Sequence, residues 1–244
     1  MDTPIATRQE DEGRDWPARW SVSVVAETGS TNADLLAWAA RGAADRTVLV
    51  ARHQTAGRGR LDRRWDAPAG ANLLVSLLFR EIPETPHVLT QRVGLAAIAA
   101  CEEVAGVSPV LKWPNDLLLD GAKLAGVLAQ AHLGPEPAVV VGIGLNVGWA
   151  PEGAACLSTA GPGTAIDPLD VLASMLHAYD ALPADVWPQY RAHLGTLGKQ
   201  VRVQLPDGEV EGRALDVEPD GRLMVVDDCG ITHRFAVGDV VHVR

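Results

Sequence analysis

The chain has 244 residues, of which 47% are apolar and 21% charged, and its formal net charge is −10. This length and apolar content are sufficient for one large hydrophobic core and a small second domain. The acidic excess argues against a protein that covers an extended polyanion such as nucleic acid.

The N-terminal half of the chain has the pattern of strands mixed with helices. Alternating apolar residues predict a strand at 21–26. A helix follows, because Thr31 and Asp34 have the spacing of a capping box and Gly42 offers a stop. The same kind of pattern predicts strands at 47–51, 72–80 and 109–113 and a helix of mostly small and aliphatic residues at 90–105.

A hairpin is predicted in the middle of the chain. Asp120-Gly121 is a two-residue turn signal between two apolar runs, so the hairpin would present Lys123. A β-branched run at 138–143 is typical of a buried strand, and Asn146 falls at its end. The strands of the hairpin are predicted at 117–119 and 124–133, and helices at 168–182 and 186–194.

The composition changes near Gly195. From Gln200 onward, short strands alternate with Pro-Asp-Gly turns, which indicates a small β-barrel. Its strands are predicted at 201–205, 210–217, 223–227, 232–236 and 240–243.

The cellular setting follows from what the chain lacks. No apolar run reaches the roughly 18 residues of a membrane span, and residues 1–20 lack the apolar stretch of a signal peptide. Cys101, Cys156 and Cys229 are odd in number and have no metal-like spacing, so we expect isolated, buried thiols in a reducing compartment. A cytoplasmic location with no membrane partner is the expectation.

Five arginines lie between residues 52 and 64, three of them in Gly57-Arg58-Gly59-Arg60-Leu61-Asp62-Arg63. With two aspartates, residues 52–66 have a local charge of +3, so the rest of the chain sums to −13. The glycines allow the backbone to approach a ligand closely, and guanidinium groups donate paired hydrogen bonds to phosphate or carboxylate. We predict a loop that is mobile when empty, because its arginines repel one another, and that orders over a small anion.

Lysine is scarce: Lys112, Lys123 and Lys199 stand against eighteen arginines. Lys112 and Lys123 are flanked by apolar residues. Either they extend from strand ends into water, or they face an anion in a partly apolar cleft.

Five segments, in this order and approximate spacing, resemble the motif series of the biotin protein ligases. They are Thr28-Gly29-Ser30-Thr31-Asn32, Gln54-Thr55-Ala56-Gly57-Arg58-Gly59-Arg60, Lys112-Trp113-Pro114-Asn115-Asp116-Leu117, Lys123-Leu124-Ala125-Gly126 and Gly142-Ile143-Gly144-Leu145-Asn146. The chain departs from some relatives at Leu61-Asp62, where those carry Arg-Gly. Residues 1–20 are too short for the DNA-binding domain of repressor-type members, so we expect a short form without repressor activity.

The resemblance implies an α+β fold in two domains. A mixed-sheet catalytic domain, like the core of class II aminoacyl-tRNA synthetases, would span residues 21–197 and bind biotin and ATP. An SH3-like β-barrel would span residues 198–244, and residues 1–20 would form a polar, flexible leader.

The resemblance also implies a reaction, that of a biotin–[acetyl-CoA-carboxylase] ligase. Biotin would be activated by ATP, with Mg²⁺ on the phosphates, to biotinoyl-5′-AMP. A lysine of the biotin carboxyl carrier domain of an acyl-CoA carboxylase would then accept the biotinoyl group. The protein would act as a monomer or homodimer and bind no nucleic acid.

By motif match, Lys123, Arg58 and Asp116 would be catalytic. Asp116 either orients or deprotonates the acceptor amine, or holds a turn, and Ser30 and Thr31 either bind biotin or only cap a helix. His53 is expected to be structural, and the match identifies no metal ligand. Biotin binding is assigned to Ser30, Thr31, Asn32, Gln54, Gly57, Arg58, Gly59, Arg60, Lys123 and Gly126. ATP binding is assigned to Arg60, Arg63, Trp65, Lys112, Asn115 and Asn146, with Trp65 and Asn146 on adenine.

Two alternative functions fit fewer of these features. A lipoate or octanoate protein ligase shares the fold, but it lacks the Gly-Arg-Gly-Arg pattern and needs no polar side chains for a ureido group. A nucleic-acid-binding module could use the arginines on phosphates. The −13 outside the loop and an aromatic content of 5% argue against it.

Overall fold

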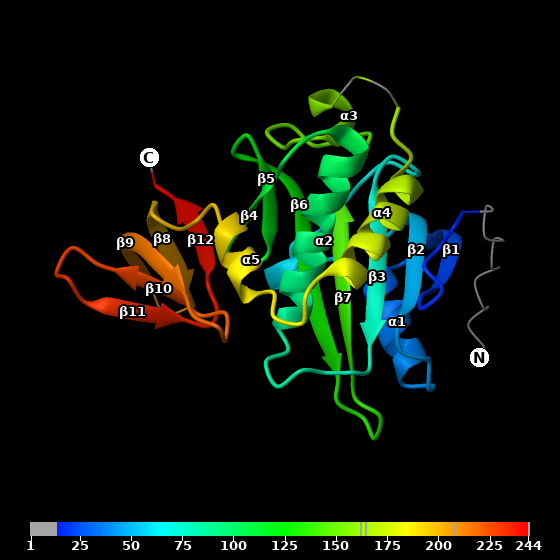
Figure 1. Ribbon diagram of the computed structural model, residues 1–244, viewed down its shortest axis with the longest axis horizontal. Helices are drawn as coiled ribbons and strands as arrows, with labels where there is room; N and C mark the ends of the chain where they lie inside the picture. The colour runs from blue at the N-terminus through cyan, green and yellow to red at the C-terminus, as the bar shows by residue number, and fades with distance from the viewer. Residues whose placement is uncertain (1–13, 162, 164, 207, 244) are drawn as a thin grey trace.

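The computed structural model describes residues 14–161, 163, 165–206 and 208–243, which form two β-sheets and their covering helices (Figure 1). The larger sheet has the strand order β1-β2-β3-β7-β6-β5-β4, and the smaller has the order β11-β10-β9-β8-β12. In Figure 1, helix α5 (Trp187–His193) lies between the two sheets. Within the described residues, no helix is both long enough and apolar enough to cross a membrane.

The larger sheet is mixed, as predicted. Its first two strands run parallel, and every other neighbouring pair is antiparallel. The strands are β1 (Ser21–Thr28), β2 (Thr47–Gln54), β3 (Leu73–Phe79), β4 (Val110–Lys112), β5 (Asp116–Leu119), β6 (Ala122–His132) and β7 (Ala138–Leu145).

Helices cover both faces of this sheet, which explains its continuous apolar strands. Helix α1 (Thr31–Ala39) packs on one face, and α2 (Val88–Ala105) with α4 (Pro168–Ala181) packs on the other. On β7, Val139 and Val141 join the core under α2 and α4, while Val140 joins the core under α1. Successive side chains of the strand therefore belong to two separate cores, one on each face of the sheet. A short helix, α3 (Leu157–Ala160), follows β7.

The predicted hairpin is present. Asp120 and Gly121 have φ of 50° and 82°, the positive values that a two-residue hairpin turn requires. The register of β5 and β6 shifts on the way to this turn, because Leu117 pairs with Ala125 but Leu118 pairs with Lys123. Because β6 has one extra residue at this point, the side chains of β6 beyond the shift point to the opposite face of the sheet from the one that regular alternation would give them.

The start of α1 differs from the prediction of a capping box. Thr31 is the first helical residue, and Ser30, which precedes it, makes no side-chain cap. Instead, Oε1 of Gln54, at the end of β2, accepts the Thr31 backbone N–H at 2.8 Å. The Asp34 carboxylate accepts a hydrogen bond from the Thr28 hydroxyl. A neighbouring strand therefore satisfies the helix N-terminus, and the reading of Ser30 and Thr31 as caps is wrong.

The prediction of a flexible leader is wrong for residues 14–20, and residues 1–13 lie outside the described part of the chain. Trp20 is only 6% exposed and packs edge-on against Tyr179, with ring centroids 5.3 Å apart. Its Nε1 donates to Asp180 at 3.0 Å, and Arg14 forms an ion pair with Asp170 at 3.0 Å. These residues are part of the folded domain.

The C-terminal residues form a five-stranded antiparallel sheet, as predicted. Alternate residues such as Val201, Val203 and Val225 are fully buried inside it. The strands are β8 (Gln200–Leu205), β9 (Gly208–Val217), β10 (Leu223–Val226), β11 (Thr232–Phe235) and β12 (Asp239–His242).

Tryptophans join the two sheets. Trp113, 2% exposed, donates from Nε1 to the Gly221 carbonyl at 2.9 Å, and its backbone N–H donates to the Thr196 hydroxyl at 3.0 Å. Trp187 of α5 donates from Nε1 to the Val217 carbonyl at 3.2 Å. Hydrogen bonds from buried rings to backbone atoms leave little freedom between the sheets.

Candidate functional site

A cavity of about 280 Å³ opens over β3, β7 and β6, beneath the arginine loop that follows β2. Residues from both sheets line it, since Asp239 of β12 is among them. The sequence-predicted residues that line it are Ser30, Thr31, Asn32, Gln54, Arg58, Gly59, Arg60, Arg63, Trp65, Asn115, Asp116, Lys123, Gly126 and Asn146. The fold thus gathers into one site residues that are spread over more than a hundred positions.

Two predicted residues do not line the cavity. Gly57 closes the base of the loop: its carbonyl accepts the Trp65 backbone N–H at 3.0 Å, and a Cβ there would lie 2.3 Å from the Trp65 carbonyl oxygen. Lys112 is on the edge strand β4, beside a separate small cavity. Its charge, with that of Lys199, helps to lower the pKa of His242. The assignment of Lys112 to ATP stays a prediction.

Glycines form the floor of the cavity. Gly126 of β6 and Gly144 of β7 are cross-strand partners, and the indole of Trp65 lies on them. A Cβ on Gly144 would be 2.4 Å from Trp65 Cε2. Trp65 Nε1 is buried and has no hydrogen-bond partner among the described residues. An aromatic ring with an unused donor thus lies on bare backbone inside the cavity.

One end of the cavity is polar and neutral. Asn32 donates from Nδ2 to Gln130 Oε1 at 3.0 Å and to the Leu128 carbonyl at 3.2 Å, which fixes the orientation of its amide. Its Oδ1 lies 2.6 Å from the Ser76 hydroxyl, which is also 2.7 Å from Thr31 Oγ1. Because Ser76 has one proton, it donates to only one of the two oxygens.

Two polar groups at this end keep free hydrogen-bonding capacity. Gln54 Oε1 is taken by Thr31, whose N–H and hydroxyl lie 2.8 and 3.1 Å away. Within the described chain, neither Gln54 Nε2 nor the Ser30 hydroxyl has a hydrogen-bond partner. Both residues line the cavity. The Gln54 amide nitrogen can donate a hydrogen bond to a ligand, and the Ser30 hydroxyl can donate or accept one.

The other end is charged. Lys123 Nζ lies 2.7 Å from Asp116 Oδ1 and 5.6 Å from the centroid of the Trp65 ring. The shifted register of β5 and β6 explains this position, because Lys123 and Gly126, three residues apart, both line the cavity. Asn115 donates to the Val127 carbonyl at 2.8 Å and so holds the segment before β5 in place. The pairing of Asp116 with Lys123 favours a functional role for Asp116 over a turn role alone.

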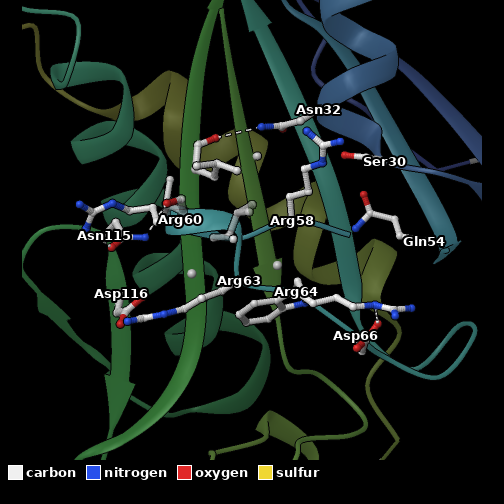
Figure 2. A pocket seen from close by; sticks show the side chains of 18 of the residues that line it. Ser30, Asn32, Gln54, Arg58, Arg60, Arg63, Arg64, Asp66, Asn115 and Asp116 are labelled. Atoms are coloured by element: carbon white, nitrogen blue, oxygen red, sulfur yellow. Dashed lines mark hydrogen bonds and ion pairs between the residues drawn. The ribbon is translucent and has the colours of Figure 1, made fainter. Parts of the chain in front are cut away.

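The loop arginines spread in different directions (Figure 2). Arg58 extends toward Ser30 and Asn32, and no described residue forms an ion pair or side-chain hydrogen bond with its guanidinium. Arg60 donates to Asn115 Oδ1 at 3.2 Å, and Arg64 pairs with Asp66 at 2.7 Å. Arg63 forms an ion pair with Asp239.

The loop therefore has more support, from its own backbone and from neighbouring elements, than mutual repulsion of its arginines predicts. Three of its arginines have protein partners, and the Gly59 N–H donates to the Arg63 carbonyl at 2.7 Å. Arg58 and Arg64 form an isolated antiparallel bridge, so the loop closes on itself as a short hairpin. Its mobility without ligand stays a prediction.

Asn146 is 2% exposed and holds the cavity wall together. Its Nδ2 donates to the Ala155 carbonyl at 3.0 Å, and its Oδ1 accepts from Asn72 at 3.2 Å. The predicted adenine contact would have to use the remaining lone pair of Oδ1.

Several lining residues were missed. Ser76 is the one polar residue in the apolar strand Leu73–Phe79, and this interruption could have identified it. Asp239 had no local signal, because it reaches the cavity only through the packing of the second sheet. Outside the cavity, His53 pairs with Glu27 at 2.9 Å, in keeping with a structural role.

The free thiols lie outside the cavity. Cys101 and Cys156 are buried as predicted, whereas Cys229 is exposed, so the prediction is wrong for that residue. Burial raises the pKa of Cys101 to about 12, which leaves it an unreactive thiol.

Comparison with known sequences matches both sheets to one kind of protein. Residues 24–146 match the biotin/lipoate A/B protein ligase family, and residues 196–243 match the biotin protein ligase C-terminal domain. The biotin–[acetyl-CoA-carboxylase] ligase of Mycobacterium tuberculosis is 42% identical, over 91% of this chain and 89% of its own. The bifunctional ligase/repressor BirA of Bacillus subtilis is 33% identical, over 76% of this chain and 63% of its own.

Solved structures give the same result. The biotin protein ligase from Aquifex aeolicus, in complex with biotin and ATP, superimposes with a TM-score of 0.78 at 27% identity and covers 92% of this chain. The match extends over 99% of that chain, so both sheets and their arrangement are shared. On the evidence of both domain matches, the relative at 42% identity and this fold, the chain belongs to the biotin/lipoate A/B protein ligase family and is a biotin protein ligase.

Proposed function

We propose that the protein activates biotin with MgATP to biotinoyl-5′-AMP and transfers the biotinoyl group to a lysine of a biotin carboxyl carrier domain of acetyl-CoA carboxylase. The observation that carries this proposal is the polarity of the cavity. Uncharged groups with free hydrogen-bonding capacity lie at one end, with the Arg58 guanidinium beside them, and a glycine floor joins them to an end that holds the Lys123–Asp116 pair.

The charged end suits the first step. The carboxylate of biotin must attack the α-phosphorus of ATP, and two anions in a cleft of low polarity repel each other by several kcal/mol, to order of magnitude. Lys123 offers a cation at this end, and Arg58, which has no described ion-pair partner, offers a second cation from the loop above the cavity. Pyrophosphate would leave as the acyl phosphate bond forms.

The neutral end suits the ring of biotin. A ureido group has one acceptor and two donors, which match the hydroxyl of Ser30 and the amides of Gln54 and Asn32. The fused ring and valeryl chain need apolar contacts, which Leu128 of β6 and the ring of Trp65 supply on the cavity face of the sheet.

The second step needs an unprotonated lysine amine. Asp116, whose side chain is 17% exposed, would accept a hydrogen bond or a proton from the incoming amine, and Lys123 beside it would stabilise the charge left on AMP. No cluster of three or more His, Cys, Asp or Glu suited to a metal occurs among the described residues. In this proposal Mg²⁺ therefore binds as MgATP, coordinated by the phosphates of the substrate.

The partner and setting belong to the same proposal. The Mycobacterium tuberculosis relative is named for acetyl-CoA carboxylase, which supports a carrier domain of that enzyme as the acceptor. We propose a cytoplasmic protein, monomeric or homodimeric, that binds no nucleic acid, in keeping with its charge of −10.

The test is to mix the protein with biotin, MgATP and a biotin carboxyl carrier domain and to weigh the carrier. A mass increase of one biotinoyl group is expected, and none is expected without ATP or with the acceptor lysine of the carrier replaced by arginine. Lipoate and octanoate replace biotin in parallel reactions, because the family includes lipoate ligases. Modification by either of these acids, with biotin inactive, would contradict the proposal.

A further inference from the structure

The corner between β11 and β12, formed by Gly238 and Asp239, binds the arginine loop. Arg60 donates from its two terminal nitrogens to the Gly238 carbonyl at 3.2 and 3.1 Å. Arg63 forms an ion pair and a hydrogen bond with the carboxylate of Asp239. Two of the loop arginines are thus held by the second sheet, while Arg58 extends into the cavity.

The corner is held rigidly. Gly238 has φ of +152°, and a Cβ there would lie 2.8 Å from Val203 Cγ1, so a larger residue would disturb both backbone and packing. Asp239 begins β12 and pairs with Gln204 of β8. The Trp113 hydrogen bond to Gly221 fixes the sheet to the catalytic domain. The carboxylate of Asp239 therefore needs little ordering to meet the loop.

The loop transmits this contact to the cavity. The Arg63 carbonyl accepts the N–H of Gly59 at 2.7 Å, and Gly59 directly follows Arg58. If Arg63 leaves Asp239, the short hairpin loses its outer anchor, and Arg58 loses its support. The Arg63 side chain is 63% exposed, so the ion pair is weak. A contact that shifts an equilibrium only a few fold contributes little to the stability of the fold. It can still change the fraction of molecules in which the loop is closed.

We propose that Asp239 is a positioning residue for biotin activation, because through Arg63 it holds the arginine loop closed over the cavity and slows loss of the adenylate. This inference rests on the proposed function. Biotinoyl-5′-AMP is a mixed anhydride that water destroys, so closure of the loop would both retain it and exclude water.

The test measures how fast biotinoyl-5′-AMP, formed in place from biotin and MgATP, leaves the protein. Asp239→Asn, which keeps the size and removes the charge, and Arg63→Ala should each speed its loss about twofold to fivefold. The double variant should be no worse than the single ones, because both remove one contact. Exchange of the charges, Arg63→Asp with Asp239→Arg, should recover part of the retention.

Two readouts separate positioning from a general structural effect. Biotin affinity without nucleotide should be unchanged in Asp239→Asn, because the residue acts on the closed loop. Glu211→Gln, which breaks an exposed pair with Arg202 on the same sheet, should retain the adenylate as the wild type does.

Wild-type retention in both Asp239→Asn and Arg63→Ala, or effects that multiply in the double variant, would overturn this inference while leaving the proposed function intact. Failure of the wild-type protein to release pyrophosphate from biotin and MgATP would overturn the proposed function, and this inference with it.

Discussion

Lys123 Nζ lies 2.7 Å from Asp116 Oδ1, across the two strands whose register shifts by one residue. The extra residue in β6 aims Lys123 into the cavity beside Asp116. A cation for the developing phosphate charge and a carboxylate for the incoming amine are thereby held on one pair of strands.

The cations of the cavity should be essential for adenylate formation. Lys123→Ala and Arg58→Ala are each expected to slow pyrophosphate release with biotin and MgATP by about 10²-fold or more, because one preorganised charge is lost. Both side chains line an open cavity, so both variants should remain folded by circular dichroism. Arg202→Ala, on the surface of β8, serves as the control. Near-normal release in both cavity variants would refute the assignment.

Asp116→Asn should separate the two steps. Adenylate formation depends on Lys123, which this variant keeps, whereas attack by the acceptor amine loses its carboxylate. We expect transfer from preformed adenylate to the carrier, measured in a single turnover, to slow more than pyrophosphate release does. Equal slowing of both steps would mean that Asp116 acts only by placing Lys123.

The glycine floor should resist even a methyl group. Gly144→Ala places a Cβ 2.4 Å from Trp65 Cε2, so we expect it to cost about 1–3 kcal/mol of unfolding free energy in urea titrations. In a Trp65→Ala background the clash is gone, and the cost should fall below about 1 kcal/mol. The same cost in both backgrounds would show that Trp65 does not rest on Gly144.

Trp20 should be a core residue. Trp20→Ala is expected to lower the free energy of unfolding by about 3–5 kcal/mol, because the ring packs against Tyr179 and its N–H donates to Asp180. Leu133→Ala, at a side chain that is 88% exposed, should stay within about 0.5 kcal/mol of wild type. Equal stability of the two variants would restore the flexible-leader prediction.

Acid should destabilise the protein through His242. Burial, together with Lys199 and Lys112, lowers its pKa from 6.5 to about 4. The unfolded chain therefore binds the proton more readily than the folded protein does. The contribution of His242 to the free energy of unfolding is fully present above pH 6.5 and is lost as the pH drops toward 4. His242→Gln should flatten this part of the curve of unfolding free energy against pH. Leu133→Ala, at an exposed side chain that does not titrate, should leave the shape of the curve unchanged.

The sequence by itself determined the strands, the main helices and most residues of the cavity. Apolar alternation and the Asp120-Gly121 turn are local signals, because strand period and positive φ depend on neighbouring residues. The five ordered motifs then identified the family. Sequence spacing could not show which of Lys112 and Lys123 faces the cavity, since both lysines lie beside apolar residues.

Tertiary structure decided the rest. A register shift, which depends on strand pairing, brings Lys123 into the cavity, while Lys112 stays on an edge strand. The Thr31 N–H is satisfied by Gln54, 23 positions away, so a local capping pattern failed. Asp239 meets Arg63 across 176 positions, and Trp20 finds its core partners only when the chain has folded. Contacts of this kind arise from packing between distant segments, for which no pattern of neighbouring residues exists.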